Sequence, residues 1–178
     1  MSNSDNDPED QTRFAAEPRL RLPVVVRPLA HGDMPAWIAL RQALWSYEDQ
    51  DELAREAETM ALTGRAYIRL AFDAQGEAVG LLEFSVRDEA PGSGGRAVPY
   101  AEGWYVAPAA RGAGVGRALL ACLEDWAQAQ GYSAIGSDTI PSLFPDSTAA
   151  HVALGFRVVG EGPDADGDMD RFFYKQLV

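Results

Sequence analysis

The sequence predicts one α/β domain of the α+β class, with a mixed, mostly antiparallel sheet of about six to seven strands flanked by about four helices. A chain of 178 residues suits a single domain. Because 47% of its residues are apolar and 24% are charged, it can build a sizeable core. Helical and strand patterns alternate irregularly, with a hairpin early in the chain and antiparallel pairing late, which disfavours a regular doubly wound fold.

Residues 1–21 form a predicted flexible acidic tail, because they are polar and show no sustained hydrophobic periodicity. The predicted domain therefore spans residues 22–178. Its first strand is expected over residues 22–27, an apolar and β-branched run that ends at Pro28. The acidic start of the chain also lacks the basic and apolar parts of a signal peptide, so we expect a cytoplasmic protein.

Two helices and a hairpin are predicted next. Asp33 is the predicted N-terminal cap of the first helix. A charged second helix over residues 49–62 stops at Gly64, which suits a left-handed C-terminal cap. Residues 65–72 and 78–86 are then strands joined by a short polar turn, as in a β-hairpin.

The second half of the chain begins with the glycine- and proline-rich loop 87–98, which we expect to shape the mouth of a substrate site. A strand over residues 99–106 and an amphipathic helix over residues 115–130 follow it. The last predicted elements are a strand at 133–137, a helix at 147–154, a strand at 156–159, an acidic loop at 160–170 and a strand at 171–177.

The formal net charge of −12 restricts the possible partners. Such a field repels phosphate backbones and anionic lipids, so nucleic-acid and membrane-surface functions are disfavoured, whereas cationic ligands are attracted. Lys175 is the one lysine in the chain, so a phosphate site must use arginine or backbone N–H groups. The sequence therefore favours a cationic small molecule, such as a polyamine, as a ligand.

No metal ion is predicted. The single cysteine, Cys122, excludes an intrachain disulfide and a multi-cysteine metal site. The predicted acidic loop alternates aspartates much as a calcium-binding loop does, but it lacks the terminal glutamate of that motif. We expect a solvated loop at these four aspartates, which are Asp164, Asp166, Asp168 and Asp170.

A glycine-rich turn joins the predicted strand 99–106 to the helix after it, with the sequence Arg111-Gly-Ala-Gly-Val-Gly-Arg117. Glycines let the backbone approach a ligand, and the free N–H groups of a helix's first turn attract anions, so this turn predicts a pyrophosphate site. A P-loop needs a lysine at the position of Arg117, and a dinucleotide fingerprint needs a glycine there. On these residues alone, a plain tight turn remains the alternative.

In full context, Arg-x-x-Gly-x-Gly after a strand that ends in Val106-x-Pro108 resembles the acetyl-CoA signature of the GNAT superfamily of N-acetyltransferases. The likeness continues to the Leu154-Gly155-Phe156 step and covers about residues 24–178. It implies acetyl-CoA as co-substrate, with the turn's amides on the pyrophosphate and the preceding strand along the pantetheine arm. The cofactor-binding residues implied are Trp104, Tyr105, Val106, Arg111, Gly112, Ala113, Gly114, Val115, Gly116 and Arg117.

A narrower resemblance is to the aminoglycoside 6′-N-acetyltransferases. It is carried by four phrases in the right order, at residues 40–45, 80–87, 102–106 and 137–138. It implies transfer of acetyl to the 6′-amine of an aminoglycoside, hence antibiotic resistance, and a homodimer, since such enzymes are often dimers. It also implies that Trp45, Glu102 and Asp138 line the aminoglycoside site.

The catalytic residues predicted within this resemblance are Asp138, Glu102 and His151. Asp138 is the predicted proton acceptor, and Glu102 holds the substrate and can share this chemistry. The alternative for each acid is a solvated or salt-bridged place at a strand end. A backbone N–H at Tyr105 or Val106 is expected to stabilise the oxyanion.

His151 and Trp45 each have two interpretations. Many superfamily members place a tyrosine at the position of His151 to protonate the leaving thiolate, so His151 is a predicted donor; packing or capping within its helix is the alternative. Trp45 forms either a cation–π wall against a charged sugar or part of the core.

The chain also departs from the aminoglycoside enzymes. The loop at Ala90 lacks their tyrosine, an extra residue falls near Phe144, and Val158-Val159 replaces an expected acidic pair. The CoA motif is unaffected, but two alternatives stay open. One is an acetyltransferase for a polyamine, another small amine or a peptide, and the other is a non-catalytic acyl-CoA-binding module.

Overall fold

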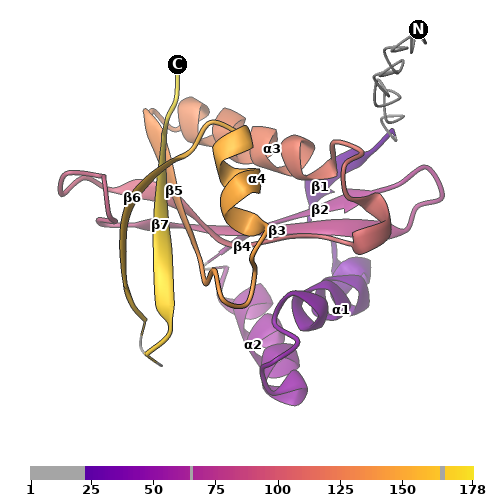
Figure 1. The fold of residues 1–178 in the computed structure, drawn as a ribbon. Helices are drawn as coiled ribbons and strands as arrows, with labels where there is room; N and C mark the ends of the chain where they lie inside the picture. The colour runs from indigo at the N-terminus through magenta and orange to yellow at the C-terminus, as the bar shows by residue number, and fades with distance from the viewer. Residues whose placement is uncertain (1–22, 65, 165–166) are drawn as a thin grey trace, which may run out of the picture.

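The computed structural model describes residues 23–64, 66–164 and 167–178, so the predicted tail 1–21 and Asp166 lie outside the described residues. One sheet contains seven strands, which are β1 (Val25–Pro28), β2 (Tyr67–Phe72), β3 (Ala78–Arg87), β4 (Val98–Val106), β5 (Ala134–Thr139), β6 (Arg157–Pro163) and β7 (Met169–Gln176). The helices are α1 (Met34–Leu44), α2 (Gln50–Thr63), α3 (Val115–Ala129) and α4 (Ser147–Ala153), with short 3-10 turns η1 (His31–Asp33) and η2 (Pro108–Ala110) (Figure 1).

The strand order is β1-β2-β3-β4-β5-β7-β6, and every neighbouring pair is antiparallel except β4 and β5. The parallel pairing is confined to Tyr100 with Gly136 and Ala101 with Ser137. Beyond these residues the two strands part, and Figure 1 shows the β5–β7–β6 part of the sheet turned away from the β1–β4 part. The predicted fold class, a mixed and mostly antiparallel sheet with four helices, is confirmed.

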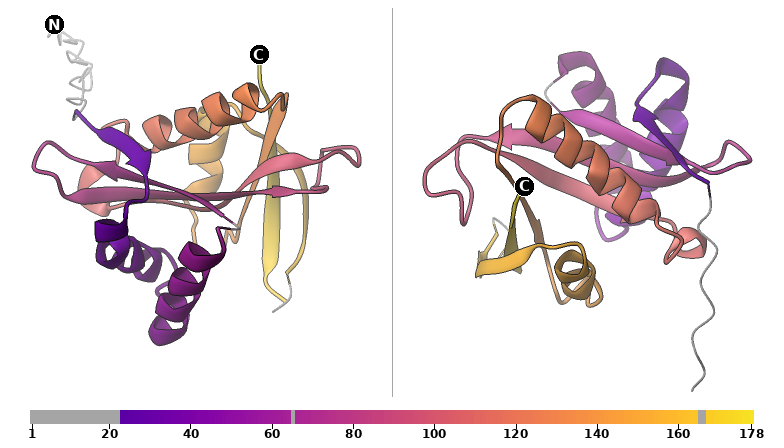
Figure 2. Two further views of the ribbon diagram at one scale, coloured as in Figure 1. Left: turned by 180° about the vertical axis from the view of Figure 1, so that it is seen from behind. Right: turned by 90° about the horizontal axis from the view of Figure 1, so that it is seen from above.

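Helices cover both faces of the β1–β4 part of the sheet (Figure 2). On one face, α3 buries Leu119 and Leu123 against Phe84 of β3. On the other face, α1 buries Trp37 against Leu81 of β3, and α2 packs beside α1. Within the described ranges, no helix is both long and apolar enough to cross a membrane.

The predicted helix ends are largely confirmed. Asp49 caps α2 by accepting a hydrogen bond from the Glu52 amide at 2.8 Å, and Gly64 ends that helix with a left-handed φ of 62°. Asp33 does precede α1, but its carboxylate does not cap that helix. It binds the Arg27 guanidinium instead, which lowers the pKa of Asp33 to about 2.

Two boundaries differ from the prediction in ways that affect the site. β5 runs to Thr139, so Asp138 lies within a strand and not after it. β6 runs to Pro163 and β7 starts at Met169, so most of the predicted loop 160–170 belongs to a hairpin. The backbone ladder between β6 and β7 forms despite the polar sequence, because strand propensity depends strongly on cross-strand context.

A buried polar network fixes α1 to the sheet. Glu83 of β3 is 2% exposed and accepts hydrogen bonds from Trp37 Nε1 at 2.6 Å and Arg41 Nη1 at 2.5 Å. Burial raises the pKa of Glu83, while the Arg41 charge opposes that rise. Both carboxylate oxygens are therefore satisfied, and the network holds α1 in one orientation above β3 and β4.

Candidate active site

A β-bulge in β4 places Glu102 where β4 and β5 part. The β3–β4 register shifts so that Glu102 has no partner on β3. Ala101 is the last residue of β4 that pairs with β5, and Asp138 directly follows its partner Ser137. Bulges often lie beside active sites, where they redirect a side chain. The two predicted carboxylates thus stand on either side of one opening in the sheet.

A groove with a volume of about 1400 Å³ occupies this opening. Every site residue predicted from the sequence lines it except Val115, whose side chain is 1% exposed and belongs to the core. Only the backbone of Val115 is left to meet a ligand. The loop 87–98, expected at the mouth of the site, contributes no lining residue. It packs elsewhere, with Gly92 against the Tyr174 side chain.

One end of the groove is the turn between β4 and α3. Gly112 and Gly114 have φ values of 77° and 95°, which other residues rarely adopt. No side chain caps α3, and the Ala118 amide bonds to Gly114 O at 3.0 Å, so the amides before it are left for an anion. Arg111 Nε donates to Val106 O at 3.0 Å and closes the turn. The predicted anion site therefore has the required geometry.

Glu102 is held within an ion-pair network. The Ser85 hydroxyl donates to its Oε1 at 2.6 Å, and Arg87 binds both carboxylate oxygens, with Nε at 3.0 Å from Oε1. The Arg87 guanidinium in turn lies 3.5 Å from the centroid of the Tyr100 ring. The negative charge of Glu102 is therefore largely compensated inside the protein, and its carboxylate is fixed in orientation.

Asp138 has a different environment, although it lies across the same opening. Burial raises the pKa of Asp138 to about 6, against the opposing charge of Arg87. The negative charges of Asp170 and Glu102 raise it further. Among the described residues, no ion pair engages Asp138. It is thus ionised at neutral pH and more basic than an ordinary aspartate.

His151 is 4% exposed and both of its ring nitrogens have partners. Nδ1 lies 2.8 Å from the Ser147 carbonyl oxygen, and since a carbonyl can only accept, Nδ1 carries the proton. Nε2 then accepts from the Ser137 hydroxyl at 3.1 Å. Burial lowers the pKa of His151, and its ring stacks on Phe173 at 4.1 Å between centroids. The imidazole is therefore neutral and tightly held.

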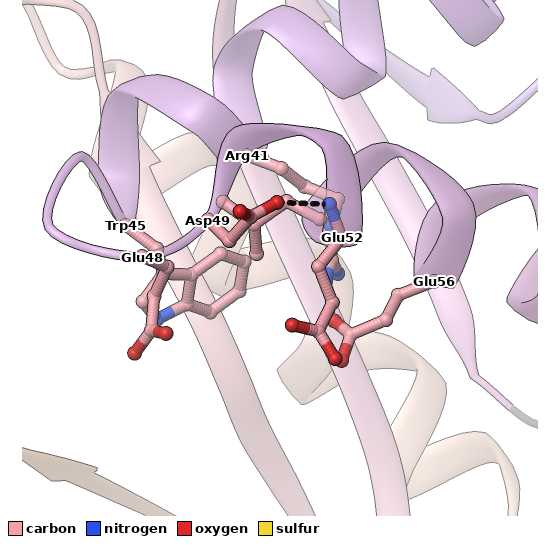
Figure 3. Close-up of a pocket in the computed structure, with 7 residues that line it drawn as sticks. Arg41, Trp45, Glu48, Asp49, Glu52 and Glu56 are labelled. Carbon is pink, nitrogen blue, oxygen red and sulfur yellow. Dashed lines mark hydrogen bonds and ion pairs between the residues drawn. The ribbon is translucent and has the colours of Figure 1, made fainter.

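Trp45 lines the groove and also a smaller pocket of about 320 Å³ (Figure 3). The pocket is lined by Arg41, Trp45, Glu48, Asp49, Glu52, Leu53 and Glu56. Arg41 lies 4.8 Å from the Trp45 ring centroid and binds Glu56 at 2.9 Å. A Cβ at Gly103 would lie 2.7 Å from the indole, so only glycine lets Trp45 pack over β4.

Several groove residues were missed in the sequence. Tyr47 and Phe144 line the groove with ring centroids 6.3 Å apart, and they come from the α1–α2 and β5–α4 connections. They supply aromatic surface that the loop at Ala90 lacks. Asp170 of β7 also lines the groove. The extra residue near Phe144 was an available signal, nothing local marked Tyr47, and the alternating aspartates that include Asp170 predicted a solvated loop instead.

Opposite charges occupy the two ends of the groove. Arg111 and Arg117 flank the glycine turn. Beyond the opening in the sheet, the lining carries the acidic residues Glu48, Glu102, Asp138, Asp146, Asp164 and Asp170. The groove is therefore suited to an anionic group at the turn and to cationic groups at the other end.

A sheet that opens after a β-bulge, with a glycine turn into a helix at its edge, defines a class of acyl-CoA-dependent transferases. The acetyltransferase (GNAT) family matches residues 34–156, and the chain belongs to that family. The expected resemblance is thereby confirmed.

Named relatives are more specific. The chain is 37% identical over 141 residues to an aminoglycoside N(6′)-acetyltransferase type 1 of Klebsiella aerogenes, covering 77% of this chain and 91% of the relative. A second enzyme of that name, from Stenotrophomonas maltophilia, is 37% identical over 74% of this chain and 84% of its own. Among solved structures, aminoglycoside N-acetyltransferase AAC(6′)-Iy in complex with CoA aligns with a TM-score of 0.72 and 26% identity, over 80% of this chain and 93% of that chain.

Proposed function

We propose that this protein transfers the acetyl group of acetyl-CoA to the 6′-amine of aminoglycosides and so gives resistance to them. The observation that carries the proposal is the two-ended groove, with an anion turn at one end and six acidic side chains at the other. Aminoglycosides carry several ammonium groups, which such an acidic wall attracts. The relatives named aminoglycoside N(6′)-acetyltransferase support the same acceptor.

The turn fits the pyrophosphate of acetyl-CoA. The uncapped amides of α3 and the left-handed Gly112 and Gly114 form a main-chain cradle, and Arg111 and Arg117 add positive charge beside it. β4 beyond Ala101 has no β5 partner, so its main-chain groups are open to the pantetheine arm. When bound, acetyl-CoA supplies an activated acetyl group as a thioester.

Asp138 and Glu102, the two carboxylates at the opening, have different roles toward the attacking amine. The amine attacks only in its neutral form, so a base must take its proton. Asp138 is ionised above a pKa of about 6 and is in the better position for that role. Glu102, with its charge compensated by Arg87, orients the amine.

The other roles follow from the same geometry. A main-chain N–H at Tyr105 or Val106, beyond the last β4–β5 pair, is the donor for the developing oxyanion. His151 stays a predicted donor to the thiolate. His151 itself lines the groove, but its neutral ring carries its one proton on Nδ1, toward the Ser147 carbonyl. Nε2 must therefore take up a proton before His151 can give one to the thiolate.

We propose in addition a cytoplasmic homodimer built from the single domain 22–178. Acetyl-CoA is a cytoplasmic metabolite, and a chain with one cysteine suits a reducing compartment. Light scattering on the purified protein tests the assembly. A mass twice the chain mass of 19.2 kDa is expected, and a mass equal to it would contradict the dimer.

The decisive experiment is an acetyl-CoA-dependent thiol-release assay with kanamycin, tobramycin, spermidine and a peptide with a free N-terminus. We expect rapid release with the two aminoglycosides and a product that NMR shows to be acetylated at the 6′-nitrogen. If spermidine or the peptide is acetylated faster than the two aminoglycosides, that amine is the acceptor instead. Binding of acetyl-CoA without turnover of any amine would identify a non-catalytic acyl-CoA-binding module.

A further inference from the structure

Asp170, at the start of β7, lies on the same face of the sheet as Asp138. Asp138 pairs with Phe172 across the antiparallel β5–β7 ladder. Since side chains alternate along a strand, Asp170 shares the face of Phe172 and is the diagonal neighbour of Asp138. Both aspartates line the groove. The sequence placed Asp170 in a solvated loop, but the β6–β7 hairpin brings it into the acidic end of the site.

The charges around these two aspartates are unbalanced. Arg87 of β3 is the cation that faces both of them, and it is bound to both oxygens of Glu102. In the described part of the chain, no arginine, lysine or histidine forms an ion pair with Asp170. The nearby hairpin acids Asp164 and Asp168 add further negative charge. Among the described residues, no ion pair therefore neutralises the carboxylates of Asp138 and Asp170.

We propose that Asp170 is a specificity residue that binds a second, charged ammonium group of the acceptor while Asp138 receives the reacting amine. The proposal rests on the acceptor class proposed above. The two aspartates differ in role because the reacting amine must lose its proton, whereas a second amine of the same molecule stays protonated at neutral pH. An acceptor with several amines thus gains a charge-assisted hydrogen bond that a single-amine acceptor lacks.

Asp170 also affects the base next to it. Burial raises the pKa of Asp138, the negative charges of Asp170 and Glu102 add to that rise, and Arg87 of β3 and the nearby Tyr100 of β4 oppose it. Removing the charge of Asp170 lowers the pKa of Asp138. The acidic limb of the rate profile should then move to lower pH, an effect that a purely structural role for Asp170 does not produce.

The test compares Asp170→Asn with wild type on tobramycin and on 6-amino-6-deoxyglucose, a sugar with one amine. We expect KM for tobramycin to rise about tenfold, clearly more than KM for the single-amine sugar. Asp170→Glu, which keeps the charge, should recover most of the loss. The matched control is Glu58→Gln on the exposed surface of α2, which changes the net charge equally at a residue that does not line the groove. Equal losses on both acceptors, or the same loss in the control, would overturn the proposal.

Calorimetry with tobramycin in the presence of CoA separates this inference from the proposed function. If wild type binds tobramycin but does not acetylate it, the proposed function fails, while weaker binding by Asp170→Asn still supports the role of Asp170. If wild type acetylates tobramycin and Asp170→Asn binds it equally well, the inference fails and the proposed function stands. If wild type does not bind tobramycin, both fail.

Discussion

The two ends of the groove are built in different ways. The coenzyme end is one continuous segment, residues 104–117, and it offers mainly backbone groups held by glycines with left-handed φ. The acceptor end combines side chains from α1, β4, β5, β7 and the loops between them. A backbone site is fixed by local geometry, whereas a side-chain site depends on how distant elements pack.

This difference predicts how each end responds to substitution. At the acceptor end, single side chains carry the chemistry and the recognition, so their replacement should affect turnover and amine affinity while leaving CoA affinity intact. At the coenzyme end, only changes that alter the backbone or introduce like charge should matter.

The largest effect is expected at Asp138. Asp138→Asn keeps the shape of the side chain but removes the base, so kcat should fall about 1000-fold, within the range of general-base catalysis. CoA affinity, measured by calorimetry, should stay at the wild-type value. Asp138→Ala should behave in the same way. Wild-type turnover of an aminoglycoside by either variant would refute the assignment of the base.

The pH dependence of kcat/KM gives a second test of Asp138 as the base. Because the raised pKa of Asp138 lies at about 6, wild-type kcat/KM should rise with pH through about 6 as the carboxylate ionises, and level off above it. Glu102→Gln should keep such a limb but move it to lower pH, because the Glu102 charge helps to raise the pKa of Asp138 and the variant leaves Arg87 without its ion-pair partner. Loss of the limb in Glu102→Gln and its retention in Asp138→Asn would exchange the two roles.

At the coenzyme end, Gly114→Glu should weaken CoA binding at least about 100-fold, because like charges in contact cost several kcal/mol. The new carboxylate would stand at the anion site in place of a glycine whose φ is 95°. Gly76→Glu is the matched control, since Gly76 also has a positive φ of 83° and open space around it, in the β2–β3 turn, which does not line the groove. Equal CoA affinity in the two variants would contradict the anion site.

A smaller effect is expected at Trp45. Trp45→Ala removes the aromatic wall over Gly103, so KM for tobramycin should rise about tenfold, which corresponds to a partly desolvated cation–π contact. KM for acetyl-CoA should change little. If Trp45 served the core alone, the variant would lower the melting temperature and leave KM for tobramycin unchanged.

The smallest effect is expected outside both ends. Removal of residues 1–21 should change kcat/KM by less than about twofold, because a polar segment without periodicity has no apolar face to pack on the domain. A steady-state assay on the shortened chain checks this. A large loss of kcat/KM would show that residues 1–21 contribute to the site, which would then consist of more than its coenzyme and acceptor ends.

The sequence allowed most of the coenzyme end to be predicted, because glycine spacing between a strand and a helix is a local signal. It also allowed α2 to be predicted over residues 49–62 with its stop at Gly64, while the cap at Asp49 emerged from the structure. The bulge at Glu102 was not predictable in this way, since it exists only as a register shift between two strands. The place of Asp170 depended likewise on the pairing of β6 with β7, which overrode a strongly polar local sequence.

Where β4 parts from β5, the backbone pairing of the sheet is interrupted. A ligand that lies along the free edge of β4 acts as a substitute strand, and its arrival should stiffen both halves of the molecule at once. Amide hydrogens at the far end of β4 should then exchange with solvent much more slowly in the loaded protein than in the empty one. In this fold the coenzyme is therefore a structural element as well as a reactant.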